Sequence, residues 1–340
     1  MTEKSRQSTS RTATVTLLSQ NSYRNSSKIR RVGAIVSLLI GAVFTIWKIR
    51  SQLKDSQKFT LHNWIRKKHT AHRRLQATNR PIIYTFYAPI VRFGQTSSRE
   101  AKIAKTDQQL LDVWKTSWSD AGFNPIVLAL DDAQQHPYYQ QYVDALSSVT
   151  LLGAGGRNQE YNEYCFLRYI AMVTVGGGLL CDYDVMPLIG NQPIQPIDDR
   201  KFTVFQRTLN KAGAVPSLAN GNASEWDRMA MVILQIAKTP PPEGGWSDMV
   251  ALMEAQKRIP DTYILRNEVV GYRDVMQDLN SICQKTQLAW AIHLSHYDVL
   301  AMGYRVYDRP QVAQDFVANF KTNCYRKMQD QGQDQINSQR

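Results

Sequence analysis

The sequence predicts an α/β fold: a Rossmann-like, open and mostly parallel sheet with helices on both faces, preceded by an N-terminal transmembrane helix. A strand pattern, an amphipathic helix pattern and a second strand pattern follow one another from Pro81, which is the order of a right-handed βαβ crossover. An uncharged apolar run at residues 32–47 precedes them. With 340 residues, 43% of them hydrophobic, the chain can fill the core of one large domain.

The positive charge of the chain is concentrated in its first part. The formal net charge is +12, but residues 1–80 hold 17 Lys and Arg against 2 Asp and Glu, whereas residues 81–340 hold 24 against 27. Domains that bind nucleic acid usually spread positive charge over the folded surface that contacts the phosphates. The distribution therefore argues against nucleic acid as a partner.

The apolar run from Val32 to Trp47 lies between basic residues on both sides. We predict a transmembrane anchor over residues 32–48, although the run is shorter than the about 20 residues that usually span a bilayer. A signal peptide is a weaker alternative because no small-residue cleavage site follows, and a buried core helix is a second one. Lys and Arg flank both ends, so charge does not decide the orientation of the anchor.

Composition divides the rest of the chain. Residues 1–31 and 328–340 are polar with few large apolar side chains, which predicts a disordered basic tail at one end and a second disordered tail at the other. Residues 49–80 are polar and basic, which is typical of a stem that holds a domain away from a membrane. One folded domain is expected over residues 81–327.

The folded domain begins with alternating strand and helix signals. Residues 81–90 form a β-branched and aromatic run bounded by prolines, which predicts a buried strand. Thr106 is a candidate N-cap for a helix that ends at Gly122 and carries two tryptophans on one face. A second strand is predicted over residues 124–130.

A further helix pattern, over about residues 162–175, leads through three glycines into a short apolar strand that ends at Asp182. In an open parallel sheet, ligands bind at the carboxyl ends of the strands. Because side chains alternate along an extended segment, Asp182 and Asp184 point the same way and can face one cation.

Two carboxylates so close together repel each other unless a cation lies between them. Their oxygens favour a hard ion, Mg²⁺ or Mn²⁺, which takes phosphate oxygens as its remaining ligands. The suggested chemistry is activation of a diphosphate leaving group, with the metal as Lewis acid. A bare D-x-D occurs by chance about once in a chain of this length, so the surrounding residues decide what it means.

The surrounding residues resemble a known family. FLRYIAMVTVGGGLLCDYDVMPL, at 166–188, resembles the donor-site signature of DXD-containing GT-A fold glycosyltransferases. GGWSDM, at 244–249, resembles a segment of the initiating α-1,6-mannosyltransferase-like branch of the glycosyltransferase sugar-binding-region superfamily. WAIHLSH, at 290–296, resembles a late strand that ends in a metal-binding His. The resemblance covers roughly residues 81–305.

The resemblance implies a metal-dependent hexosyltransferase with its GT-A catalytic domain at residues 81–327. A nucleoside-diphosphate sugar would be the donor, a glycan or glycolipid the acceptor, and Mn²⁺ or Mg²⁺ the cofactor. An anchor followed by a stem is also how Golgi members are usually built. We therefore expect a single-pass type II protein of the Golgi or endoplasmic reticulum membrane, with a luminal catalytic domain and a usable glycosylation sequon at Asn222.

The resemblance also assigns site residues. The donor-binding residues are expected to be Arg168, Gly177, Asp182, Asp184 and Tyr87. The metal ligands are expected to be Asp182, Asp184 and His293, with His296 as the alternative His. A guanidinium in an apolar helix needs an anionic partner, which favours a functional Arg168. The family pattern commonly has an Asp three residues before this Arg, where the chain has Cys165, so the donor sugar is not decided.

Other candidates keep two interpretations each. Asp248 is the candidate catalytic or acceptor-orienting residue, although an acid at a loop-to-helix junction is also an ordinary N-cap. Trp226 and Trp246 could stack on an acceptor sugar or could be buried. The four cysteines lack the spacing of a zinc site and allow at most two disulfides.

Two other functions compete with glycosyl transfer. Haloacid-dehalogenase-like phosphohydrolases also place D-x-D after an apolar strand, but they need the motif early in the domain and a Thr or Val where this chain has Met186. A non-catalytic, membrane-tethered carbohydrate-binding protein could keep the fold without turnover.

Overall fold

The structure, a computed structural model, describes residues 80–90, 98–152, 157–188, 198–208, 213–276, 283, 286 and 289–325. Both predicted tails, the predicted anchor and stem residues 49–79 lie outside these residues. Among the described helices, none is long and apolar enough to cross a membrane.

The described strands form two sheets. The central sheet has the order β2-β1-β3-β6-β5-β7, and its strands are β1 (Ile82–Phe86), β2 (Asn124–Leu128), β3 (Gly177–Cys181), β5 (Thr203–Arg207), β6 (Ala214–Asn222) and β7 (Ile264–Leu265). The second sheet has the order β4-β9-β8, and its strands are β4 (Val185–Pro187), β8 (Val269–Gly271) and β9 (Ala291–His293). The D-x-D therefore lies where the chain passes from β3 in one sheet to β4 in the other.

The central sheet is mixed. β1 pairs in parallel with β2 and β3, as the βαβ order requires, whereas β6 pairs antiparallel with both β3 and β5. Residues 208–213 alone separate β5 from β6, and a connection this short joins antiparallel neighbours. The prediction of an α/β domain is confirmed, but the sheet is mixed: β6 runs antiparallel to both of its neighbours, whereas β5 and β7 pair in parallel.

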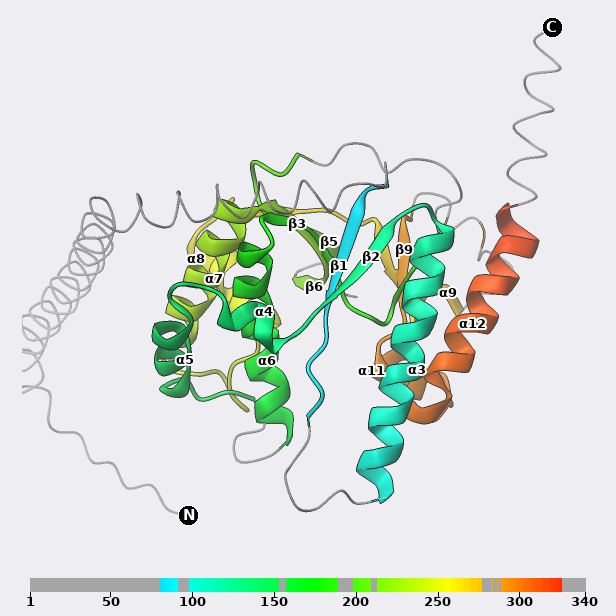
Figure 1. The fold of residues 1–340 in the computed structure, drawn as a ribbon, viewed down its shortest axis with the longest axis horizontal. Helices are drawn as coiled ribbons and strands as arrows, with labels where there is room; N and C mark the ends of the chain where they lie inside the picture. Colours follow the sequence, from blue (N-terminus) through cyan, green and yellow to red (C-terminus); the bar gives the residue numbers. More distant parts are fainter. Residues whose placement is uncertain are drawn as a thin grey trace, which may run out of the picture. The chain divides into compact units, whose positions relative to one another are not determined.

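Helices cover both faces of the central sheet (Figure 1). The first layer consists of α4 (Leu130–Gln134), α5 (Tyr139–Ser147), α6 (Arg157–Thr174), α7 (Ala223–Ala237) and α8 (Asp248–Arg258). The second layer consists of α3 (Ser98–Asp120), α9 (Tyr272–Met276), α11 (His296–Ala301) and α12 (Arg309–Phe320). Each layer has its own cluster of buried apolar side chains. Neighbours Ile83 and Tyr84 on β1 belong to opposite clusters because side chains alternate along a strand.

Helix α3 starts earlier than the sequence predicts. Thr106 lies inside the helix, where its hydroxyl donates to the Lys102 carbonyl at 2.8 Å instead of capping the N-terminus. The helix ends before Gly122, which has a φ of +89°, as expected for a glycine after a helix. The indole of Trp118 is fully buried and donates to the Val185 carbonyl at 3.0 Å, which ties α3 to the start of β4.

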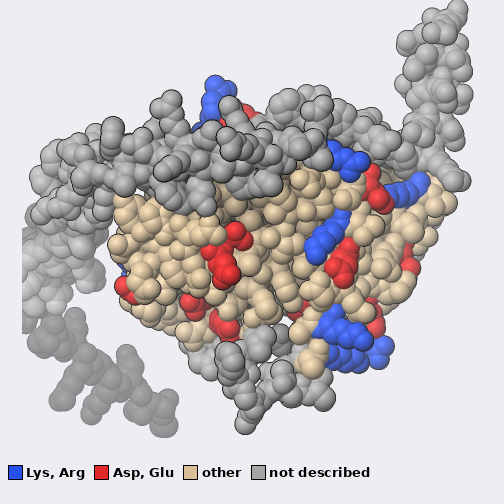
Figure 2. All heavy atoms as spheres, in the orientation of Figure 1, with Lys and Arg blue, Asp and Glu red and all other residues tan. Residues whose placement is uncertain are grey.

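Charged side chains are mixed on the face of the molecule in Figure 2, where Lys and Arg lie among Asp and Glu in small groups. The near balance of 24 basic against 27 acidic residues over 81–340 agrees with this mixture. On the described residues of this face, we see no extended patch of one sign of the kind that follows a phosphate backbone.

Candidate active site

Three glycines turn the chain from α6 into β3. Gly176 has a φ of +94°, the left-handed conformation predicted for the residue after this helix. A side chain at Gly177 would lie 2.5 Å from the backbone of Asn222 and Ala223. The close approach at Gly177 is thus to the chain's own backbone, at the opposite end of β3 from Asp182. The geometry gives its predicted donor contact no support.

The D-x-D forms a tight turn between the two sheets and is not the extended segment that the sequence suggests. The Asp182 N–H donates to the Ser217 carbonyl on β6 at 2.7 Å, and the Val185 N–H donates to the Asp182 carbonyl at 3.0 Å. The carbonyl of Asp184 accepts from the Leu294 N–H at 2.8 Å. The backbone of this turn is therefore held by both sheets.

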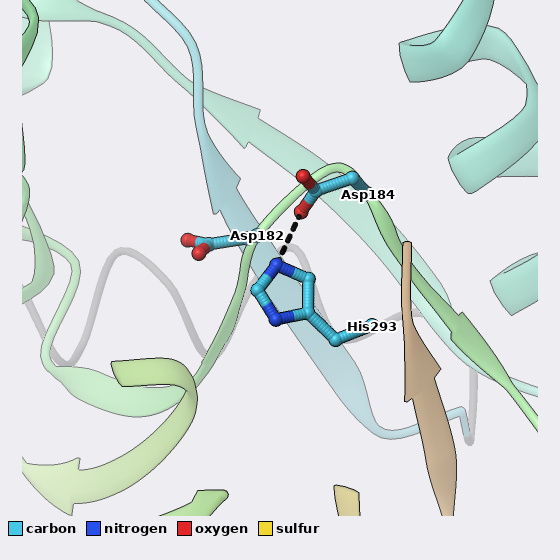
Figure 3. A group of neighbouring side chains, drawn as sticks. All are labelled: Asp182, Asp184 and His293. Carbon is cyan, nitrogen blue, oxygen red and sulfur yellow. Dashed lines mark ion pairs between the residues drawn. The ribbon is translucent and has the colours of Figure 1, made fainter. Parts of the chain in front are cut away.

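The ligand atoms of Asp182, Asp184 and His293 all lie within 4.8 Å of one another. Figure 3 shows the His293 ring directed at Asp184, while the carboxylate of Asp182 points away from Asp184 in this view. His293 ends β9, and its Nε2 lies 3.4 Å from Asp184 Oδ1. His293 Nδ1 lies 2.9 Å from Gln206 Oε1, which also accepts from the Ser217 hydroxyl. An amide oxygen at Nδ1 requires the proton there and leaves Nε2 as a ligand atom, as metal-binding histidines generally require.

The donor set fits a divalent cation: two carboxylates and one oriented imidazole suit Mg²⁺ or Mn²⁺. The cluster could therefore hold a metal ion. His296, the alternative ligand, is the first residue of α11 and lies outside this cluster.

Asp182 is held from the first layer. Arg168, on α6 and 7% exposed, donates from Nη1 to Asp182 Oδ1 and from Nη2 to Asp248 Oδ2. The other Asp248 oxygen accepts from the Met249 N–H at 2.7 Å. Burial of a guanidinium between two carboxylates explains how the apolar helix α6 accommodates an arginine.

Asp248 is the first residue of α8 and is not the cap of this helix. The N-cap is Ser247, whose hydroxyl accepts from the Val250 N–H at 3.2 Å. The capping alternative for Asp248 is therefore wrong. Both carboxylate oxygens of Asp248 are occupied by donors, so the geometry shows a residue that positions Arg168. Its catalytic role stays a prediction.

Asp184 is held from the second layer. Arg309, the first residue of α12 and 5% exposed, donates from Nη2 to Asp184 Oδ2, and its Nε donates to the Leu294 carbonyl at 3.4 Å. Arg309 is 125 residues away in the sequence, and no local pattern marks it apart from an Arg-Pro pair at a helix start. Each aspartate thus has its own buried arginine, so the expectation that only an added cation can separate the two charges is wrong.

The surroundings shift the pKa values of the two aspartates in opposite directions. Burial raises the pKa of Asp182 to about 6, opposed by Arg168 and supported by the charge of Asp184. Burial also acts to raise the pKa of Asp184, but His293 and Arg309 outweigh it and lower that pKa to about 2. Burial acts to lower the pKa of His293, but Asp184 outweighs it and the pKa is raised. Asp184 is the more firmly ionised carboxylate.

Tyr161 is close enough to the site for the charges of Asp182 and Asp184 to act on its hydroxyl, and sequence reasoning misses it. Its side chain is on α6, four residues before Cys165 and seven before Arg168, so the three share a helix face. Cys165, partial burial and the charges of Asp182 and Asp184 raise the pKa of Tyr161, and the residue is 51% exposed. The i to i+7 spacing from Arg168 is the signal that could have identified it.

Tyr87 follows β1 and contacts Tyr183 edge-on, with ring centroids 5.6 Å apart. Since Tyr183 is the middle residue of the D-x-D, Tyr87 lies next to the turn, near the aspartates with which it is predicted to bind the donor.

Burial raises the pKa of the Cys165 thiol, which leaves it protonated and unreactive. Cys283 and Cys324 form a disulfide, while Cys165 and Cys181 are free.

The two tryptophans expected to stack on an acceptor are core residues. Trp226 is 1% exposed and donates to the Gly178 carbonyl at 3.1 Å, and Trp246 is 2% exposed and donates to the Thr239 carbonyl at 3.2 Å. The burial alternative describes both side chains. Asn222, the sequon residue, is the N-cap of α7, and its Oδ1 accepts from the Glu225 N–H at 3.0 Å.

Part of the chain is similar in sequence to a known protein family. A family model described as a domain of unknown function (DUF8765) matches residues 75–195. No curated protein sequence matches the chain.

Solved structures that are similar to the chain include three glycosyltransferases. A glycosyltransferase involved in the glycosylation of the major capsid of PBCV-1 is 11% identical with a TM-score of 0.39, over 69% of this chain and 100% of that one. The apo-form glycosyltransferase GlyE of Streptococcus pneumoniae TIGR4 is 13% identical with a TM-score of 0.34, over 71% and 64%. PaToxG glycosyltransferase is 12% identical with a TM-score of 0.31, over 75% and 96%. With TM-scores below 0.5, these similarities do not assign a function to the chain.

Proposed function

We propose that the chain is a metal-dependent glycosyltransferase of the GT-A type that moves a hexose from a nucleoside-diphosphate sugar to a glycan or lipid-linked acceptor. One observation carries the proposal: the fold brings His293 to the D-x-D from more than a hundred residues away, and the ligand atoms of Asp182, Asp184 and His293 all lie within 4.8 Å of one another. They do so where β3 ends, the edge of an α/β sheet at which ligands bind. The sequence resemblance at residues 166–188 agrees with the proposal.

The chain's residues divide the work of such a reaction. Asp182, Asp184 and His293 would hold the cation, which as a Lewis acid stabilises the negative charge that develops on the diphosphate leaving group. Asp248 holds Arg168 against Asp182. A catalytic role for Asp248 would require the release of one of its hydrogen bonds, because both of its oxygens already accept one.

The half-exposed ring of Tyr161 offers a surface for a sugar or base beside the carboxylates. Tyr161 and Tyr87 therefore replace the two buried tryptophans as the aromatic groups of the proposed site. The donor sugar and the acceptor remain undefined by these contacts, since none of them is specific for one hexose.

Turnover of sugar nucleotides tests the proposal. The full chain is incubated with Mn²⁺ and a panel of UDP- and GDP-sugars, and in parallel with phosphomonoesters. We expect release of a nucleoside diphosphate that disappears in Asp184→Asn and persists in Asp131→Asn, which changes an exposed carboxylate on α4. Phosphomonoester hydrolysis would favour the phosphohydrolase alternative. Sugar binding without turnover would favour the carbohydrate-binding alternative.

We further propose that the domain lies in the lumen of the Golgi or endoplasmic reticulum, behind a single-pass type II anchor at residues 32–48. The Cys283–Cys324 disulfide supports an oxidising compartment. Protease added outside intact microsomes should leave the domain intact. Complete digestion would place the domain in the cytosol.

A further inference from the structure

Arg309 connects helix α12, the residue after β9 and the D-x-D turn. Its Nη2 pairs with Asp184 Oδ2, and its Nε donates to the Leu294 carbonyl at 3.4 Å. The Leu294 N–H donates back to the Asp184 carbonyl at 2.8 Å. Helix α12, the residue after β9 and the turn are therefore joined through one buried guanidinium, which is 5% exposed.

The two oxygens of Asp184 have different partners. Oδ2 is taken by Arg309, whereas Oδ1 lies 3.4 Å from His293 Nε2 and faces the cluster. Arg309 thereby fixes the plane of the carboxylate and leaves one oxygen for a cation. An oriented ligand of this kind binds a metal through one atom.

The orientation of Asp184 by Arg309 favours metal binding, whereas the positive charge of Arg309 disfavours it. The site contains three carboxylates, from Asp182, Asp184 and Asp248, and two guanidinium groups. Divalent-cation affinity depends on the number of ligand charges, so a site whose carboxylates are mostly neutralised binds such an ion weakly. A fixed positive charge paired with the same carboxylate as the cation would repel it strongly in a partly buried site.

We infer that Arg309 is a built-in counter-cation of Asp184, which competes electrostatically with a divalent metal and so sets the metal affinity of the Asp182, Asp184 and His293 cluster. The inference rests on the metal site of the proposed glycosyltransferase. Arg309 touches no reacting atom, so it is a positioning residue.

Metal titration of Arg309 variants tests the inference. Mn²⁺ alone is titrated by calorimetry into the full chain, without any nucleotide. Arg309→Gln should bind Mn²⁺ at least about tenfold more tightly than the wild type, because the repulsion is removed and Asp184 loses its partner. Arg309→Lys keeps the charge and should stay within about threefold of the wild type. Arg228→Gln, which breaks the Arg228–Glu225 pair on α7, is the matched control and should not change the affinity.

The outcomes separate the inference from the proposed function. Binding by the wild type with equal or weaker binding by Arg309→Gln overturns the inference and leaves the metal site standing. No binding by either protein overturns both. Tighter binding by Arg309→Gln supports the inference whether or not the wild type binds measurably.

A second measurement covers the case in which Arg309→Gln does not fold. Wild-type chain with ¹⁵N-labelled arginine is titrated with diamagnetic Mg²⁺, and the Arg309 guanidinium signals are assigned from Arg309→Lys. Competition for Asp184 predicts that Mg²⁺ shifts these signals and speeds their hydrogen exchange. Unchanged Arg309 signals at saturating Mg²⁺ overturn the inference.

Discussion

Only Tyr183 separates Asp182 from Asp184, yet the two side chains are held from different helix layers. We call Asp182 with its partners the first half of the site, and Asp184 with its partners the second half. Asp182 is held by Arg168, from α6 of the first layer, and Asp184 is held by Arg309, from α12 of the second. Their pKa values move in opposite directions, to about 6 and about 2. At the D-x-D, each of the two helix layers thus contributes one buried arginine, which pairs with one of the two carboxylates.

The two halves also differ in how much of the site is local. Arg168 is 14 residues from Asp182, on the helix that leads directly into β3. Arg309 is 125 residues from Asp184. The family match at residues 75–195 includes Arg168 and both aspartates but stops before His293 and Arg309. Arg168 and Asp182 thus come from one continuous motif, whereas folding brings Asp248, His293 and Arg309 to it from outside that motif.

Removing the arginine of the first half should have the largest effect. Arg168→Gln leaves Asp182 and Asp248 without their shared buried cation, which should lower the free energy of unfolding by about 3–5 kcal/mol. Urea unfolding measures this loss. Arg258→Gln, in a partly exposed pair with Glu254 on α8, should cost less than about 1 kcal/mol.

The double variant Arg168→Gln with Asp248→Asn sharpens the comparison. It removes one of the two stranded carboxylates and should regain part of the stability lost in the single variant. A loss below about 1 kcal/mol in Arg168→Gln would show that the first half of the site is not held by this ion pair.

Removing a carboxylate of the second half should weaken metal binding, and it should also cost stability because the buried Arg309 loses its partner. Asp184→Asn removes the more firmly ionised ligand, so Mn²⁺ affinity should fall about a hundredfold. Calorimetry measures the affinity, and Asp131→Asn serves as the surface control. Wild-type affinity in Asp184→Asn would remove this residue from the metal site.

The sequence predicts the first half of the site better than the second, for physical reasons. Helix α6, the turn at Gly176 and the end of β3 follow from local periodicity and from the backbone freedom of glycine, and the structure confirms them. The antiparallel position of β6 depends on strand pairing, which local patterns do not encode. The same limit applies to Arg309, whose partner is decided by the packing of α12.

Polar surroundings in the sequence were also a poor guide to burial. Trp226 is one residue before Asp227, but it faces the first-layer core, where it packs edge-on against Phe202 with ring centroids 4.7 Å apart. A single face of a helix can be apolar while the adjacent residue is charged. The acceptor side of the proposed site therefore could not be located from composition.

His136 and Asp227 form a second pair of titratable groups in the first layer. This pair differs from the site because burial favours the neutral forms of both groups. Burial lowers the pKa of His136 from 6.5 to about 4 and raises that of Asp227 from 3.8 to about 6. His136 Nδ1 accepts from the Tyr138 N–H at 3.2 Å, which places the ring proton on Nε2, 3.8 Å from Asp227 Oδ1. A second ring proton would break the first of these contacts.

The effects of these two pKa shifts on the free energy of unfolding should nearly cancel in the wild type. A variant that lacks one of the two groups should show the effect of the other alone. The lowered pKa of His136 costs stability as pH falls from 6.5 to about 4, whereas the raised pKa of Asp227 costs stability as pH rises from 3.8 to about 6. Asp227→Asn leaves the His136 effect alone, so this variant should lose about 2 kcal/mol more than the wild type between pH 6.5 and pH 4.5. Urea unfolding at both pH values measures the difference. Equal losses in the two proteins would mean that the pKa of Asp227 is not raised in the fold.

The smallest expected effect separates the two adjacent residues at the start of α8. Ser247→Ala removes the hydroxyl that accepts from the Val250 N–H, and the loss of an N-cap costs about 1 kcal/mol. Ser247→Asp keeps an accepting oxygen and should recover most of it. Neither change touches Arg168, so Mn²⁺ affinity should stay at the wild-type value.

Asp248→Asn provides the decisive comparison, because it keeps a side-chain oxygen but removes the charge that faces Arg168. A cap would tolerate this change, whereas a partner of a buried guanidinium would not. We therefore expect Asp248→Asn to lose clearly more stability than Ser247→Ala in the same urea titration. The reverse order would show that the Arg168–Asp248 pair adds little stability, and that the Arg168–Asp182 pair alone holds the first half of the site.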